Sequence, residues 1–248
     1  MSEMSKRKNI MLLFSAHPDD EVLSFGPIAL RARKEGWNVI NVAVTLGSDE
    51  SQQDRRIEEV QNACGHLRIK VHIPHGAGLD VYASRDSEEW SENVTAILDI
   101  LYAHAPDVVA VHHENDWHPA HIHTNILVHD ALEQIGWNGA MLESQYWHDM
   151  FNPNVLLEVP SSDLDTLMGA LKFHTGELER NPFDKSFEGL LRFNVCRAEK
   201  VLVKGSRAPE WEYAMSYRLS LWAHGEKRVS QVPLIISESD GIDPIMER

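Results

Sequence analysis

The first 138 residues alternate strand-like and helix-like segments, and no other feature of the chain constrains the fold as strongly. Alternation of this kind is typical of parallel strands that are joined by crossover helices. The expected strands are at residues 9–16, 37–45, 69–73 and 108–111. The expected helices are at residues 27–35, 52–67 and 90–101 and from Pro119 onwards. Because such crossovers are right-handed, the expected fold class is α/β, a Rossmann-like, doubly wound, mostly parallel sheet with strand order 3-2-1-4-5.

The pattern becomes weaker after about residue 138, so a less regular C-terminal extension is expected. This part favours edge strands at Tyr146-Trp147 and 155–159, helices at 164–174 and 212–221, and a loose tail from Ser237. No repeat, low-complexity tract or Pro/Gly linker marks a second domain. We therefore expect a single domain over residues 1–248, in which residues 1–138 form the Rossmann-like core and residues 139–248 complete the pocket.

The charge and the cysteine content exclude several classes of protein. Lysine and arginine number 23 against 38 aspartates and glutamates, which gives a net charge of −15. Binding to nucleic acid or to an anionic membrane needs a basic face, so we expect neither partner. The two cysteines, Cys64 and Cys196, are too few for a disulfide scaffold and are expected to be small buried residues. No apolar run approaches the roughly 18 residues of a membrane span, so a soluble cytoplasmic protein is expected, and the sequence leaves a homo-oligomer open.

Histidine is the residue type that points to a site. The chain has 14 histidines, of which six lie within 18 positions: His112, His113, His118, His121, His123 and His129. Histidine is the commonest metal ligand and the usual acid or base near neutral pH. In a doubly wound sheet, ligands bind beyond the carboxyl ends of the strands, where the strand order reverses. The two strands that meet there are followed by His17-Pro18-Asp19-Asp20-Glu21 and by residues 112–121, so the fold and the histidines indicate one place.

The residues in these two segments have the spacing of a catalytic zinc site. His17 and Asp20 are three positions apart on the turn after the first strand. His118 and His121 are also three apart at the start of a helix, and therefore share one helix face. Catalytic zinc takes three protein ligands and keeps one position for water, and His17, Asp20 and one of the two later histidines match that count. The other histidine and Asp19 remain free for acid–base chemistry, because zinc can lower the pKa of its water to about 7.

Three strings carry a resemblance to a known family: Ala16-His17-Pro18-Asp19-Asp20-Glu21, His118-Pro119-Ala120-His121 and, on the second helix, Arg56-Ile57-Glu58-Glu59. They resemble the PIG-L/LmbE-like zinc-dependent N-deacetylases. That family includes the GlcNAc-phosphatidylinositol de-N-acetylase and the deacetylases of mycothiol and bacillithiol synthesis. The resemblance covers residues 9 to about 135. It departs from the usual HPDH string at Ala120, where the family has a carboxylate.

Each residue that matches a family motif takes an implied role. The resemblance implies that His17, Asp20 and His121 bind Zn²⁺. It makes Asp19 the general base, and later the acid that protonates the leaving amine. His118 would stabilise the oxyanion.

The resemblance also implies substrate-binding roles for three other residues. Arg56 and Glu59 match positions near the substrate pocket, and Asp116 matches an acidic position that would orient His118. From the residues alone, Arg56 and Glu59 lie off the apolar face of their helix and are also compatible with an exposed i,i+3 pair. Near the C-terminus, His174-Thr175-Gly176-Glu177 is only weakly similar to a His-x-Ser-Gln segment of the family, so no substrate contact is transferred from it.

The resemblance and the residues together predict an enzyme, a zinc-dependent hydrolase that removes an N-acetyl or other N-acyl group from an amino sugar or related amine. Two alternatives stay open: a zinc amidase that acts on a larger conjugate, and a non-catalytic module that binds a metal or a nucleotide. The turn after the first strand lacks the G-x-G-x-x-G of a dinucleotide site, which disfavours a non-catalytic module that binds a dinucleotide. His112, His113, His123 and His148 are expected to be structural, with a place in the lining of the pocket left open for each, whereas Trp117 and Trp147 fit packing and the site equally.

Overall fold

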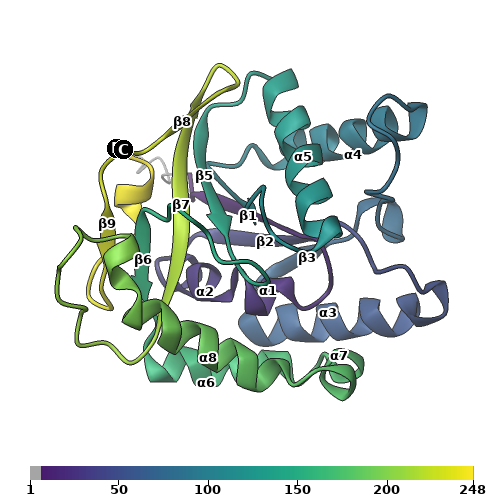
Figure 1. Ribbon diagram of the computed structural model, residues 1–248. Coiled ribbons are helices and arrows are strands. Elements are labelled where there is room, and N and C mark those ends of the chain that lie inside the picture. The colour runs from purple at the N-terminus through teal and green to yellow at the C-terminus, as the bar shows by residue number, and fades with distance from the viewer. Residues whose placement is uncertain (1–6, 248) are drawn as a thin grey trace, which may run out of the picture.

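The fold is an α/β sheet covered by helices on both faces (Figure 1), as shown by a computed structural model that describes residues 7–247. Its parallel strands are β1 (Ile10–Ser15), β2 (Asn38–Ala43), β3 (Lys70–His72), β4 (Val108–His112) and β5 (Gly139–Ser144). They lie in the order β3-β2-β1-β4-β5, which confirms the predicted order 3-2-1-4-5. The order reverses between β1 and β4, so their carboxyl ends form the switch point.

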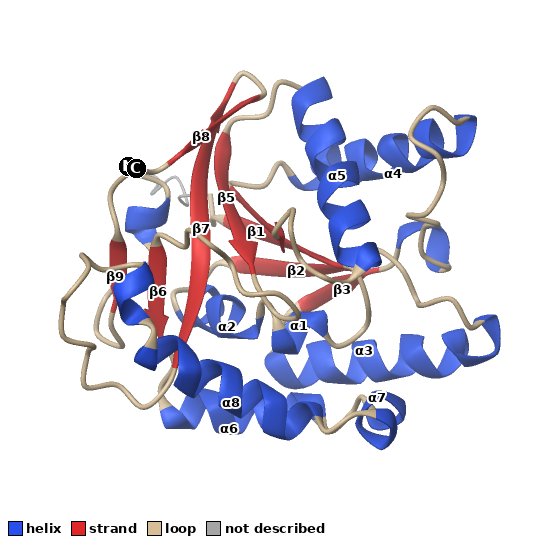
Figure 2. Cartoon of the chain, in the orientation of Figure 1, coloured by secondary structure: helices blue, strands red, loops and turns tan. Residues whose placement is uncertain are grey.

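The C-terminal part continues the same sheet with strands of mixed direction (Figure 2). These strands are β6 (Val155–Glu158), β7 (Ala214–Ala223), β8 (Glu226–Val229) and β9 (Leu234–Ile236). The long strand β7 runs antiparallel to β5, β6 and β8, and β9 runs parallel to β6. The core of the protein therefore extends without interruption from the parallel strands into the C-terminal part.

Helices cover both faces of the sheet. They are α1 (Asp20–Leu23), α2 (Gly26–Lys34), α3 (Gln53–Leu67), α4 (Glu88–His104), α5 (Pro119–Gln134), α6 (Ser161–Leu171), α7 (Thr175–Arg180) and α8 (Phe183–Cys196). In Figure 1, α4 and α5 lie on one face, and α2, α3, α6 and α8 lie on the other. Side chains alternate along β1, so Met11 and Leu13 join the second group of helices while Leu12 and Phe14 join the first. Within residues 7–247, no helix has the length and apolarity to cross a membrane.

Local sequence signals explain the helix ends that were predicted. Pro119 is the first residue of α5, where its missing N–H costs nothing. The Ser87 side chain accepts a hydrogen bond from the Trp90 N–H and caps α4. Gly36 follows α2 with a φ of 84°, a conformation that glycine adopts without a steric cost. Pro119 and Ser87 therefore set where α5 and α4 begin, and Gly36 sets where the chain leaves α2.

Two predictions for the C-terminal part are wrong in element type. Residues 212–221 were expected to form a helix, but Ala214–Ala223 form β7, which lies inside the sheet. Along β7, Met215, Tyr217, Leu219 and Leu221 alternate with Ser216, Arg218 and Ser220, which is the period of a strand, and the helix prediction overlooked this alternation. Tyr146-Trp147 form no strand and lie in the loop after β5. The expected edge strand at 155–159 is real, but it lies between β7 and β9.

Two smaller expectations also fail. The tail from Ser237 is not loose, since Ile242 and Ile245 are fully buried and a 3₁₀ turn, η4, spans Asp243–Ile245. Of the two cysteines, Cys64 is buried as predicted, whereas Cys196 is exposed at the end of α8. The expected helix at 164–174 is present as α6, which begins three residues earlier.

Candidate functional site

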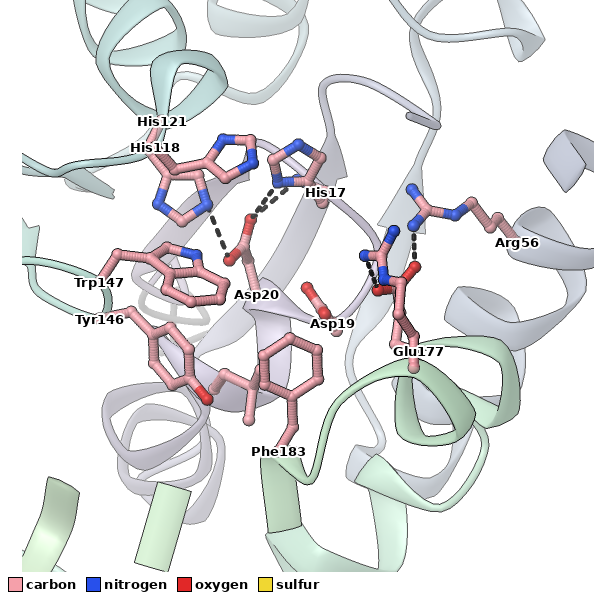
Figure 3. A pocket seen from close by; sticks show the side chains of 12 residues that line it. His17, Asp19, Asp20, Arg56, His118, His121, Tyr146, Trp147, Glu177 and Phe183 are labelled. Carbon is pink, nitrogen blue, oxygen red and sulfur yellow. Dashed lines mark hydrogen bonds and ion pairs between the residues drawn. The ribbon is translucent and has the colours of Figure 1, made fainter. Parts of the chain in front are cut away.

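A pocket opens beyond the carboxyl ends of β1 and β4 (Figure 3). His17 and Asp19 lie on the turn after β1, and Asp20 begins α1. His118 is the N-cap of α5, and His121 lies in the first turn of that helix. All five side chains line the pocket, so the structure brings together the residues of the two sequence motifs.

The backbone of Asp19 is strained. Its φ is 126°, a region that L-residues rarely adopt and that costs about 1–3 kcal/mol unless the surroundings enforce it. The Asp19 N–H donates to Glu21 Oε2 at 2.9 Å, and its carbonyl accepts from the N–H groups of Val22 and Leu23. This conformation separates the carboxylates of neighbouring residues, so that Asp20 faces the histidines while Asp19 lies between Asp20 and Glu177 (Figure 3).

Asp20 is the centre of the histidine cluster. Its Oδ1 lies 3.5 Å from His121 Nε2 and 3.2 Å from His112 Nε2. Its Oδ2 accepts the backbone N–H of His17 at 2.8 Å and lies 3.7 Å from Nδ1 of the same residue. The predicted ligands His17, Asp20 and His121 are thus neighbours around one point.

Two overlapping triads in the described chain bring one potential ligand atom each within 4.8 Å of the others: His17, His118 and His121, and Asp20, His112 and His121. Imidazole nitrogen and carboxylate oxygen are the donor atoms that zinc takes in catalytic sites, so the residues fit that metal. His121 belongs to both triads. His112, whose role the sequence left open, lies at the end of β4, where it is fully buried and its ring stacks on His121 with centroids 3.6 Å apart.

The hydrogen bonds of the two α5 histidines separate their roles. The Ala120 N–H donates to His118 Nδ1 at 3.3 Å, so a neutral His118 carries its proton on Nε2 and can donate from it. His121 Nδ1 instead lies 3.3 Å from Asp116 Oδ1, a contact that suits a proton on Nδ1 and leaves Nε2 free to coordinate. Asp116 also accepts the backbone N–H of His118 at 3.0 Å, so its carboxylate faces the ring of His121 rather than that of His118.

Burial and charge tune the acids and bases of the pocket. Burial lowers the pKa of His17 and of His118, which favours the neutral imidazole that metal binding requires. For His121, burial acts in the same direction, but Asp20 and Asp116 outweigh it and raise the pKa. Burial, together with the charges of Asp20 and Glu21, raises the pKa of Asp19 well above its usual value. A carboxyl with a raised pKa is suited to proton transfer.

Arg56 and Glu59 are not an exposed pair, because both are buried on α3 and each has other partners. Arg56 lines the pocket, forms an ion pair with Glu177 and donates to the Leu46 carbonyl. Glu59 accepts hydrogen bonds from Thr175 Oγ1 at 2.8 Å and from the Gly176 N–H at 3.1 Å. It therefore holds the first turn of α7, and it is not among the residues that line the pocket.

Apart from Leu23, the pocket residues that were not among the predicted site residues come from the C-terminal part: Tyr146, Trp147, Glu177, Arg180 and Phe183. The weak similarity at residues 174–177 was the one sequence signal that pointed to this region. Trp117 lies next to the pocket residue Trp147, with ring centroids 5.7 Å apart. The side chain of Trp117 is largely exposed. In Figure 3, the rings of Tyr146, Trp147 and Phe183 lie on one side of the aspartates and the Arg56–Glu177 pair on the other.

The site has two connected spaces. The inner one has a volume of about 50 Å³ and is walled by Leu23, Tyr146, Trp147 and Phe183 beside the histidines. A larger groove of about 760 Å³ extends over the loops after β2 and before α4. The two share His17, Arg56, His118, Glu177 and Arg180. A molecule could thus place a small group in the inner space and a larger polar part in the groove.

Comparison with known sequences gives one family and one curated relative. A family model described as PIG-L, GlcNAc-PI de-N-acetylase, matches residues 12–132. The 1D-myo-inositol 2-acetamido-2-deoxy-alpha-D-glucopyranoside deacetylase of Mycobacteroides abscessus is 29% identical over 170 residues. That match covers 55% of this chain and 59% of the relative, so the chain spans little more than half of the relative's length.

Solved structures share the fold at low sequence identity. The N,N'-diacetylchitobiose deacetylase from Pyrococcus horikoshii has a TM-score of 0.63 and 17% identity, covering 89% of this chain and 85% of that chain. The 4-carboxy-2-hydroxymuconate hydratase from Pseudomonas putida has a TM-score of 0.68 and 17% identity, covering 85% and 95%. The fold thus occurs in a deacetylase and in a hydratase, so fold likeness alone does not specify the reaction.

Proposed function

The chain belongs to the PIG-L/LmbE-like deacetylase family, and we propose that it is a zinc-dependent hydrolase that removes an N-acetyl group from an amino sugar or a related amine. One observation carries the proposal. A strained turn places Asp19, with a raised pKa, beside the cluster of His17, Asp20 and His121. A base next to a set of metal ligands is the arrangement that metal-assisted amide hydrolysis requires.

The metal would be held by His17, Asp20 and His121. These side chains supply two imidazoles and one carboxylate, and Asp116 fixes the ring of His121 from behind. Bound zinc would supply Lewis-acid polarisation of the amide carbonyl and a water of lowered pKa. His112 contacts Asp20 from the buried side and keeps its carboxylate in place.

The remaining residues move protons and stabilise charge. Asp19 takes a proton from the attacking water, and the amide carbon becomes tetrahedral. His118 donates from Nε2 to the oxyanion, which its Nδ1 hydrogen bond makes possible. Asp19 then passes its proton to the amine nitrogen as the C–N bond breaks, which releases acetate and the free amine.

The two spaces of the site suggest how substrate binds. An acetyl group fits the inner space of about 50 Å³, where Leu23, Tyr146, Trp147 and Phe183 form an apolar wall opposite the histidines and carboxylates. The amine part would occupy the larger groove, where Arg56, Glu177 and Arg180 offer charged and hydrogen-bonding groups. In this view, residues 139–248 complete the pocket of a single domain, since Tyr146, Trp147 and Phe183 form the wall of the inner space. The relatives from M. abscessus and P. horikoshii are named for N-acetylated sugars, which supports the substrate class.

A substrate panel tests the proposal. Full-length protein loaded with Zn²⁺ is incubated with N-acetylated mono- and disaccharides, with simple N-acetyl amines and with larger N-acyl conjugates, and the free amine and the released acid are quantified in parallel. We expect equal amounts of both products from at least one amino sugar. The groove of about 760 Å³ favours a second candidate, hydrolysis of a larger N-acyl conjugate, which would release a different acid in place of acetate. Protein that binds zinc but releases no amine from any member of the panel would refute both.

A further inference from the structure

A fully buried pair, Glu21 and His174, lies behind the site. His174 Nε2 lies 2.6 Å from Glu21 Oε1, and neither residue is exposed. The two are 153 positions apart, since Glu21 follows the ligand Asp20 and His174 immediately precedes α7. Burying a polar pair of this kind is costly unless each group is satisfied, so the contact indicates a specific role.

The pair is linked to the backbone of Asp19. The other oxygen of Glu21, Oε2, accepts the Asp19 N–H at 2.9 Å. Because the carboxylate of Glu21 is an acceptor at both oxygens, His174 donates to one and Asp19 to the other. The strained φ of Asp19, 126°, is therefore held by a carboxylate whose own position depends on His174.

His174 is itself fixed at both ends of its backbone. Its N–H donates to the Leu171 carbonyl at 3.0 Å, and its carbonyl accepts from the Leu178 N–H at 3.0 Å. The helix α6, which precedes it, packs against α1, α2 and α3. These contacts fix the backbone of His174, and among the described residues Glu21 is the hydrogen-bond partner of its ring.

We propose that His174 is a positioning residue that acts through Glu21 to hold Asp19 in the conformation needed for proton transfer. His174 does not line the pocket, and it links the C-terminal part to the motif after β1. The inference rests on the proposed function for its kinetic consequence, but its structural consequence is independent of activity.

The test compares two replacements of His174. His174→Leu removes the donor at similar size, and His174→Gln retains a donor, because the glutamine amide nitrogen can reach the place of Nε2. We expect the leucine variant to lower kcat by a factor of about 10 to 100, with KM and zinc content unchanged, and the glutamine variant to recover most of that loss. His129→Leu is the matched control, since the ring of this residue also makes a hydrogen bond inside the protein, to the Asn125 carbonyl, and lies outside the site. It is expected to leave kcat unchanged.

A double-mutant cycle and a structure separate positioning from general destabilisation. Glu21→Gln replaces the carboxylate that accepts from both Asp19 and His174 by an amide, so it should lower kcat as His174→Leu does. The kcat of the double variant should be no lower than that of the more impaired single variant. In a crystal structure of His174→Leu, Asp19 should leave the positive φ region. Unchanged kcat in His174→Leu, or a loss that tracks melting temperature or zinc content, overturns the inference. If the wild-type protein releases no amine from any substrate, the proposed function fails, and the φ of Asp19 in the variant still decides the positioning claim.

Discussion

The two α5 histidines show how much chemistry depends on a single hydrogen bond. His118 and His121 are three residues apart and share a helix face, so spacing leaves either as a zinc ligand. The structure distinguishes them by what each Nδ1 contacts, a backbone N–H for His118 and the Asp116 carboxylate for His121. The motifs could be predicted because they are local in sequence. The tautomers could not, since they depend on the cap of α5 and on Asp116.

This difference predicts separate effects on metal binding and on rate. His121→Ala should lose zinc, because it removes the ligand that both triads share. His118→Ala should retain one zinc per chain and lower kcat by about 10²–10³, the usual effect of removing one oxyanion donor. Metal content by mass spectrometry of the dialysed protein, together with steady-state rates, checks both variants. Loss of zinc from His118→Ala would show that it is a ligand instead.

At the scale of elements, the N-terminal half was predictable and the C-terminal part was not. The crossovers up to residue 138 carry periodic apolar patterns and punctuation such as Gly36 and Pro119. By contrast, β7 has the alternation of a strand but was predicted as a helix, and its polar residues Ser216, Arg218 and Ser220 are buried, which no local pattern indicates. The loop of Tyr146 and Trp147 also has a strand-like composition, but its rings face the pocket. Because Tyr146 and Trp147 line the pocket and do not pack in a sheet, their strand-like composition led to a wrong prediction of secondary structure.

The aromatic wall predicts the choice of acyl group. Phe183 begins α8 and is almost fully buried against the inner space, so Phe183→Ala should enlarge that space. We expect the ratio of kcat/KM for an N-butyryl over an N-acetyl substrate to rise about tenfold or more, since one methylene in an apolar pocket changes discrimination by roughly 10- to 200-fold. A competition assay with both acids quantified measures the ratio. Phe193→Ala, an exposed residue on the same helix, serves as the control and should leave it unchanged.

For the whole molecule, the decisive contacts are polar side-chain contacts between residues far apart in the sequence. Arg56 reaches Glu177, and Glu21 reaches His174, across more than 100 positions. No single-sequence pattern encodes such pairs, which explains why the resemblance located the metal residues but left the C-terminal wall of the pocket unassigned. The antiparallel strands are joined to the parallel ones in the same way, since Glu143 on β5 bonds to Arg218 on β7 at 2.8 Å and to Lys227 on β8 at 3.0 Å.

The Glu143 cluster predicts a pH-dependent contribution to stability. Burial would raise the pKa of Glu143, but the ion pairs with Arg218 and Lys227 outweigh burial and lower it below the usual value. A carboxyl with a lowered pKa in the folded state stabilises the fold above its unfolded pKa of about 4.3, and this contribution is lost as the pH falls through the folded value. Glu143→Gln should therefore lower the free energy of unfolding by about 3–5 kcal/mol at pH 7 and by less below pH 4. Urea unfolding at both pH values measures it. An equal loss of unfolding free energy at both pH values would contradict a stabilising role for the charge of Glu143.

The most direct test of the account is the rate of deacetylation by zinc-loaded Asp19→Asn. The asparagine keeps the size of the side chain and removes the group that accepts and returns the proton. The account predicts one zinc per chain, as in the wild-type protein, and a kcat that is lower by about 10²–10⁴ on the best N-acetyl substrate of the panel. A variant that binds zinc and hydrolyses that substrate at the wild-type rate would contradict it.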